Sequence, residues 1–126
     1  VMKESYPELY RTVKLYIGSL DTVLSEIRDN AYDVCLIMGT AKYIHPKHNF
    51  VFPEIVRIAR RYIITVENEI TFSLVSYPRN FKRIFEKADG AEVNSFKISR
   101  DRFPNLKDAN YLGCTVRLIR KMREAA

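Results

Sequence analysis

The sequence predicts an α/β fold, with helices around a mostly parallel sheet and an antiparallel pair of strands at the C-terminal end. Three observations predict this class. Short apolar runs alternate with segments whose apolar residues recur at helical spacing. The run at residues 34–38, VCLIM, is apolar throughout, as in strands of parallel sheets that helices cover on both faces. The last two strand-like segments alternate polar and apolar residues, and no long amphipathic helix connects them, which favours antiparallel pairing.

The first half of the chain follows this alternation. Apolar residues share one face of each expected helix, and glycine or an acidic residue follows each expected strand. In chain order we expect a strand over residues 13–17, a helix over 22–28, a strand over 34–38, a helix over 52–62 and a strand over 63–66.

The second half begins with residues 68–78, which have no clear period and are expected to form a long connection. Residues 79–88 give the clearest helix, because their apolar side chains recur at i, i+3, i+4 and i+7. Gly90 follows this helix and is expected to be its left-handed C-terminal cap. Strands over residues 93–98 and 115–120 complete the fold.

Length and composition limit the possible classes. A chain of 126 residues fits one domain, and its apolar runs are too short to span a bilayer. No signal peptide is visible, so we expect a cytoplasmic protein without a membrane partner. Cys35 and Cys114 cannot form a disulfide framework, and Cys35 is expected to pack as a small hydrophobe. The net charge of +6 could attract nucleic acid, but acidic residues interrupt the basic clusters, which favours a solvated surface.

Glycines follow two of the expected strands at equivalent positions. Gly18 ends the first expected strand and Gly39 ends the second. A glycine at such a place permits a sharp turn or the close approach of a ligand. Ligands of open α/β sheets bind at the carboxyl ends of the strands, so the pair indicates a ligand cleft there.

The run at residues 32–46, YDVCLIMGTAKYIHP, resembles the fourth-strand motif of class I S-adenosylmethionine-dependent methyltransferases. In that family a strand of the type (F/Y)DVV leads into a loop of the type xxVLxHIxP. Residues 13–21 resemble the third strand and the acidic loop that lies against the adenine, and residues 60–66 resemble the fifth strand. The resemblance covers nearly the whole chain. It implies a Rossmann-like sheet of order 3-2-1-4-5-7-6.

The resemblance also implies a site for S-adenosylmethionine and a small-molecule methyl acceptor. Tyr43 and His45 are the candidate catalytic residues beside the acceptor. The candidate cofactor-binding residues follow the two strand ends, with the first four around the adenine: Gly18, Ser19, Leu20, Asp21, Met38, Gly39 and Thr40.

Several of these side chains have a simpler interpretation. Asp21 could accept a hydrogen bond from the adenine amine, or it could cap the following helix. His45 and His48 could act as a base or as orienting groups, or could be exposed loop residues, and we expect no metal site from them. Glu67 and Glu69 are more simply solvated acids at a strand end than substrate ligands.

A similar choice applies to Arg79. With the N-terminus of the helix that it opens, it could form an anion site, but a simple turn into the helix is the favoured interpretation.

The sequence departs from the family in lacking a G-x-G-x-G loop and a second strand with an acidic end. Residues 1–126 therefore resemble the C-terminal two thirds of a methyltransferase, as a single domain that is incomplete at its N-terminus. The missing strands would lie between residues 13–17 and 34–38, and we expect weak cofactor binding or none.

An alternative function is a non-catalytic Rossmann-like module. Such a module would assemble with a partner, which could be a second copy, through the sheet edge that the missing strands leave open.

Overall fold

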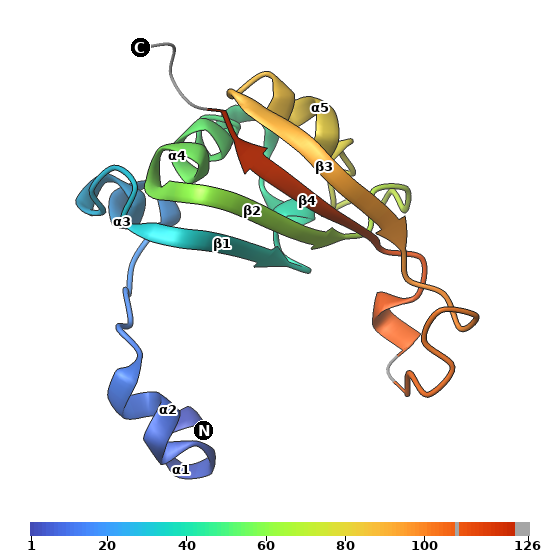
Figure 1. The fold of residues 1–126 in the computed structure, drawn as a ribbon, viewed down its shortest axis with the longest axis horizontal. Coiled ribbons are helices and arrows are strands. Elements are labelled where there is room, and N and C mark those ends of the chain that lie inside the picture. Colours follow the sequence, from blue (N-terminus) through green and yellow to red (C-terminus); the bar gives the residue numbers. More distant parts are fainter. Residues whose placement is uncertain (108, 123–126) are drawn as a thin grey trace.

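The computed structural model describes residues 1–107 and 109–122, and in them it forms one four-stranded mixed sheet (Figure 1). β1 (Tyr32–Met38) and β2 (Ala59–Glu67) are parallel. β4 (Thr115–Lys121) lies antiparallel between β2 and β3 (Gly90–Lys97), so the order is β1-β2-β4-β3. The strands expected over 34–38 and 63–66 pair in parallel, and the expected antiparallel C-terminal pair is confirmed.

Three helices lie on one face of this sheet: α3 (Leu20–Glu26), α4 (Val51–Ile58) and α5 (Phe81–Glu86) (Figure 1). Short 3-10 turns follow β1 at Ala41–Tyr43 and Pro46–His48, and another precedes β4 at Ala109–Tyr111. At the N-terminus, α1 (Met2–Ser5) and α2 (Pro7–Thr12) project away from the sheet and contain no buried residue.

The core lies between the sheet and α3, α4 and α5. Phe52 meets Phe81 and Phe85 edge to face, with ring centroids 5.8 Å apart in each pair. All three rings pack in one cluster with Ile63 of β2 and Ile119 of β4, which are fully buried. Burying these large side chains is the main stabilising contribution that this small fold can make.

Two expected elements differ from the structure. Residues 13–17 form no strand, because no neighbouring strand offers them backbone partners. They run extended beside the start of β1, where the hydroxyl groups of Tyr16 and Tyr32 lie 3.1 Å apart. The helix expected over residues 52–62 ends at Ile58, since Ala59 already pairs with Tyr32 in the sheet.

Gly90 is the first residue of β3, so the expected left-handed cap is wrong. Asp89 adopts the left-handed conformation instead, with φ of 65°. A Cβ atom on Gly90 would lie 2.7 Å from Cγ2 of Ile119 and 2.9 Å from the carbonyl oxygen of Phe85. Glycine is required here because the backbone passes so close to the core.

The expectation that helices cover both faces of 34–38 is also corrected. Cys35 and Ile37 pack against the core as expected. Val34, Leu36 and Met38 point to the other side, and Leu36 is 61% exposed. In residues 1–107 and 109–122, α3, α4 and α5 all lie on the first face, so the second face has no helical layer.

Candidate functional site

A cleft of about 340 Å³ lies between the start of α3 and the loop that follows β1. The loop occupies the carboxyl end of β1, where open α/β sheets bind ligands. Its walls come from Ser19, Leu20, Asp21, Tyr43, Ile44, His45, His48, Phe50 and Val51. Five of the predicted site residues, from two separate segments of the chain, therefore meet in one cleft.

The α3 side of the cleft presents a carboxylate. Ser19 occupies the N-cap position of α3, and its hydroxyl lies 2.8 Å from that of Thr22. Asp21 lies in the first turn rather than at the cap. Hydrogen bonds from the Ser19 side chain and from the Thr22 backbone lower the pKa of Asp21. Asp21 is therefore ionised at neutral pH and can accept hydrogen bonds in the cleft.

A buried carboxylate holds the loop on the other side. Oε1 of Glu67 accepts hydrogen bonds from the backbone N–H groups of Thr40 and Ala41, both at 2.9 Å. Glu67 is fully buried and its Oε2 has no hydrogen-bond partner within the described residues. The expectation of a solvated strand-end acid is therefore wrong for Glu67, because the loop after β1 folds over it.

Glu69 is also not solvated. Its carboxylate pairs with Arg117, with Nε to Oε2 at 2.8 Å, and Arg117 also reaches Glu92 at 2.6 Å. The side chain of Glu69 is only 8% exposed. These contacts raise the pKa of Arg117, chiefly through its hydrogen bonds with Glu69. The cluster ties the segment after β2 to β3 and β4, away from the cleft.

Arg79 holds the same loop by donating hydrogen bonds to the loop's carbonyl groups. Its guanidinium donates to the carbonyl oxygens of Ala41, at 3.1 Å, and Ile44, and to Oδ1 of Asn49, at 2.9 Å. It also stacks 5.2 Å from the ring centroid of Phe52, and burial lowers its pKa. Because these N–H groups already donate to oxygen atoms of the protein, the structure favours the simple turn over an anion site at Arg79.

The geometry of His45 limits what it can do. Its Nδ1 accepts the backbone N–H of Lys47 at 3.1 Å. The neutral imidazole then carries its proton on Nε2, so His45 can offer an Nε2–H donor to a ligand. The ring of Tyr77 lies edge to face at 5.1 Å and fixes the orientation of the imidazole.

Aromatic side chains complete the cleft. Tyr43 is 53% exposed, with the ammonium group of Lys42 lying 5.0 Å from its ring centroid. Phe50 meets His48 edge to face at 5.9 Å. Flat, half-exposed rings of this kind suit a planar ligand.

Four predicted site residues do not line the cleft: Gly18, Met38, Gly39 and Thr40. Met38 is 42% exposed at the end of β1. Gly39 has φ of 68° and donates to the carbonyl oxygen of Val66 at 3.0 Å. A Cβ atom on Gly39 would lie 3.7 Å from the ring of Tyr111, so the connection before β4 reaches the end of β1. Sequence reasoning missed Tyr111, since nothing in its local pattern marks it.

No protein-family model and no curated protein sequence matches this chain. The fold does match solved structures. One is described as a putative sarcosine dimethylglycine methyltransferase from Galdieria sulphuraria, with a TM-score of 0.63, 13% identity and 95% of this chain covered. Another is the [4+2]-cyclase SpnF, with a TM-score of 0.66, 11% identity and 98% of this chain covered.

A third match is a complex between the Haloferax volcanii Trm112 methyltransferase activator and a putative methyltransferase, with a TM-score of 0.57, 12% identity and 96% of this chain covered. This chain has a methyltransferase-like α/β fold. It spans 64% of the Galdieria protein, 60% of SpnF and 69% of the matched Haloferax chain. Because one neighbour is a cyclase, the fold alone does not define the reaction.

The described part of the chain lacks two further features. It contains no group of three His, Cys, Asp or Glu side chains placed to hold a metal ion. It also contains no helix with the length and apolar character needed to cross a bilayer. Burial raises the pKa of both Cys35 and Cys114, so neither thiol is activated.

Proposed function

We propose that residues 1–126 form part of an S-adenosylmethionine-dependent methyltransferase that acts on a small-molecule acceptor. The observation that carries this proposal is the cleft at the carboxyl end of β1, where Asp21 faces the loop bearing Tyr43 and His45. Two of the structural neighbours are described as putative methyltransferases, which supports this proposal.

The cleft suits the adenosine end of this cofactor. Asp21 offers a carboxylate for the adenine amine, Leu20 and Phe50 offer apolar walls, and Tyr43 offers a flat ring. When bound, the cofactor supplies an electrophilic methyl group. The protein's part in the transfer is to position the acceptor and exclude water, with the Nε2–H group of His45 as an orienting donor.

The methionine end of the cofactor lacks an equivalent cradle, since the sequence contains no G-x-G-x-G loop. We therefore propose that polypeptide outside residues 1–126 supplies it, and that the domain described here is the C-terminal part of the enzyme. A half-formed site holds a ligand weakly, with a Kd on the order of millimolar for adenosine compounds.

Calorimetry with S-adenosylmethionine and adenosine tests this proposal. We expect weak binding of both compounds, and further weakening by Asp21→Asn, which replaces a carboxylate by an amide at the adenine position. Asp33→Asn is the matched control, because Asp33 is exposed at the start of β1 and pairs with Arg60 at 3.5 Å. Nanomolar binding of the cofactor by this chain would contradict the incomplete site, and equal effects of the two variants would contradict the role of Asp21.

A second candidate function is a non-catalytic module that pairs with a partner through the outer edge of β1. The observation that favours it is that β1 is an edge strand, with the extended residues 13–17 nearby and unpaired in the sheet. An assembly that persists on dilution in light scattering supports this alternative. A monomer at all concentrations counts against self-assembly.

A further inference from the structure

The turn that follows β1 leaves a small space beside Gly39. Gly39 has φ of 68°, the left-handed conformation that favours glycine, and a Cβ atom on it would lie 3.7 Å from both Cε1 and the hydroxyl oxygen of Tyr111. Apart from the chain neighbours of Gly39, no other described atom lies within 4 Å of that position. Because glycine has no Cβ, the space in front of the Tyr111 hydroxyl stays open at the carboxyl end of β1.

Backbone hydrogen bonds fix the Tyr111 side of this space. Tyr111 ends the 3-10 turn Ala109–Tyr111, and its carbonyl oxygen accepts the N–H of Cys114 at 3.1 Å. Cys114 is buried and directly precedes β4, whose first residue, Thr115, pairs with Glu67 of β2. The start of β4 therefore places the Tyr111 ring over the end of β1.

The Gly39 side is fixed by β2 as well. The N–H of Gly39 donates to the carbonyl oxygen of Val66 at 3.0 Å, and the next N–H, that of Thr40, donates to Glu67 at 2.9 Å. Glu67 thus contacts the turn after β1 and pairs with the start of β4. A space whose walls are both held in this way can orient a ligand, because little motion is lost on binding.

The hydroxyl of Tyr111 can bind such a ligand. Within residues 1–107 and 109–122 it forms no hydrogen bond, although the side chain is half-buried. A buried tyrosine hydroxyl usually has a partner. A phenol oxygen can accept a hydrogen bond from an N–H or O–H group, which suits an amine or a hydroxyl compound better than a carbon nucleophile.

One loop connects this space to the cleft. It runs from Gly39 through the 3-10 turn Ala41–Tyr43 to His45, and both Tyr43 and His45 line the cleft. Gly39, a predicted site residue outside the cleft, therefore lies at the other end of the same loop. With the adenosine end of the cofactor in the cleft, the space at Gly39 is left for the acceptor.

We propose that Tyr111 is an acceptor-binding residue, and that its hydroxyl oxygen accepts a hydrogen bond from an N–H or O–H group of the acceptor beside Gly39. The acceptor is then an amine or a hydroxyl compound. This inference rests on the proposed function and adds to it the chemical class of the acceptor.

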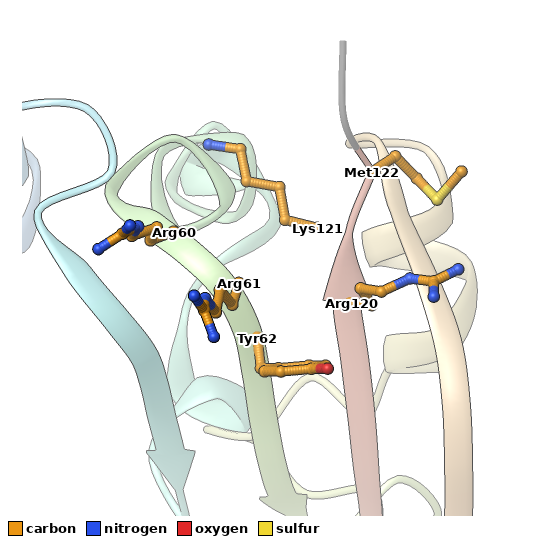
Figure 2. A pocket seen from close by; sticks show the side chains of 6 residues that line it. All are labelled: Arg60, Arg61, Tyr62, Arg120, Lys121 and Met122. Atoms are coloured by element: carbon orange, nitrogen blue, oxygen red, sulfur yellow. The ribbon is translucent and has the colours of Figure 1, made fainter.

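A larger pocket, of about 750 Å³, lies at the opposite end of β2 and provides a reference site. This basic pocket is lined by Arg60, Arg61, Tyr62, Arg120, Lys121 and Met122 (Figure 2). Figure 2 shows Arg61 and Arg120 on either side of Tyr62, pointing apart rather than toward one point. These side chains do not converge on one ligand, so Tyr62 is a suitable control tyrosine away from the proposed site.

NMR of the chain with isotope-labelled tyrosine rings tests the proposal. The probes are adenosine, S-adenosylhomocysteine and sinefungin, an analogue in which a carbon bearing an ammonium group replaces the methylated sulfur. Sinefungin therefore presents N–H donors at the reactive end of the cofactor. We expect all three compounds to shift the Tyr43 signal. The Tyr111 signal should shift most with sinefungin, less with S-adenosylhomocysteine and not with adenosine.

Two variants separate the hydroxyl from the ring. Tyr111→Phe keeps the ring and should weaken sinefungin binding at least about threefold, as for loss of a hydrogen bond to a charged group, with adenosine binding unchanged. Tyr62→Phe, in the basic pocket, is the matched control and should change neither affinity. Circular dichroism checks that each variant is folded. The comparison of the three compounds on the unsubstituted chain does not depend on either variant.

The outcomes distinguish this inference from the proposed function. A sinefungin shift at Tyr43 without one at Tyr111 would overturn the role of Tyr111 and leave the adenosine cleft intact. Equal weakening of sinefungin and adenosine by Tyr111→Phe would also overturn it, since the hydroxyl would then have a structural role only. No shift at either tyrosine with any of the compounds would contradict the proposed function, and this inference with it.

Discussion

The carboxylate of Glu67 joins the end of β2 to the loop that follows β1. Its Oε1 accepts the N–H groups of Thr40 and Ala41, and the side chain is fully buried. Without this acceptor, two backbone donors under the loop would lose their partner, which is costly in a buried place. One side chain therefore positions the segment that carries Tyr43 and His45.

Substitution of Glu67 tests this role. Glu67→Ala leaves two N–H groups without an acceptor and should lower the free energy of unfolding by about 2–4 kcal/mol. Glu67→Gln keeps a carbonyl oxygen and should lower the free energy of unfolding by less. Urea denaturation measures both. A Gln variant as unstable as the Ala variant would mean that the hydrogen bonds to Thr40 and Ala41 are not the cause.

Asp89 and Gly90 provide a second test at single residues. Gly90→Ala forces a Cβ atom against Ile119 and the Phe85 carbonyl and should destabilise the fold by about 1–3 kcal/mol. Asp89→Gly, at φ of 65°, relieves a left-handed conformation and should change stability by less than about 1 kcal/mol. Thermal unfolding of the two variants measures the difference. If Asp89→Gly destabilised the fold more than Gly90→Ala, Gly90 would again be the candidate for the helix cap.

At the scale of elements, the loop after β1 is held from both sides. Glu67 binds its N–H groups, Arg79 binds its carbonyl groups, and the N–H of Tyr77 donates to the carbonyl oxygen of Lys42 at 2.6 Å. The loop is thus fixed by β2 and by the connection that precedes α5. The wall of the cleft that this loop forms opposite α3 is therefore also held in place.

Hydrogen exchange tests the hold of Arg79 on the loop. Arg79→Lys replaces a planar group with several donors by a single ammonium group, so the contacts with Ala41, Ile44 and Asn49 cannot all be kept. Amides of residues 41–49 should exchange several-fold faster, while those of β2 and β4 should not change. Lys82→Ala, at an exposed position of α5, is the control. Unchanged amide exchange in residues 41–49 would contradict the proposal that Arg79 fixes the loop.

Most elements could be predicted from local patterns, and the exceptions have one cause. The strands β1, β2, β3 and β4 and the helices α3, α4 and α5 follow from periodicity. Residues 13–17 carry a strand pattern, but a strand also needs backbone pairing, and these residues form no ladder with β1 or with any other described strand. Helix α4 ends early because pairing of Ala59 with β1 overrides its helical spacing.

The candidate site was predictable where it depends on strand ends. Tyr43 follows β1, as expected, at the end of a parallel strand where open α/β sheets bind ligands. Asp21 follows residues 13–17, which form no strand, so the position of α3 brings it to the cleft. The burial of Glu67 was not predictable, because it depends on how a loop distant in sequence folds over it. The contact of Tyr111 with Gly39 was missed for the same reason, since it comes from the connection between β3 and β4.

At the scale of the whole molecule, one face of the sheet supports a packed core, and within residues 1–107 and 109–122 no helix covers the other. Helices α3, α4 and α5 cover the first face, and the cleft lies where the starts of α3 and α4 meet the loop after β1. The open face and the free edge of β1 both offer surfaces for further polypeptide. The proposed cofactor site, which these residues would form only in part, fits that arrangement.

We propose that the cleft at Asp21 and Tyr43 binds the adenosine end of the cofactor. The most direct measurement is an NMR titration of the isotope-labelled chain with S-adenosylhomocysteine. We predict weak, saturable shifts at Ser19, Leu20, Asp21, Tyr43 and His45, and none at Arg61 or Arg120. The absence of shifts at the cleft, or shifts confined to the basic pocket, would contradict the claim.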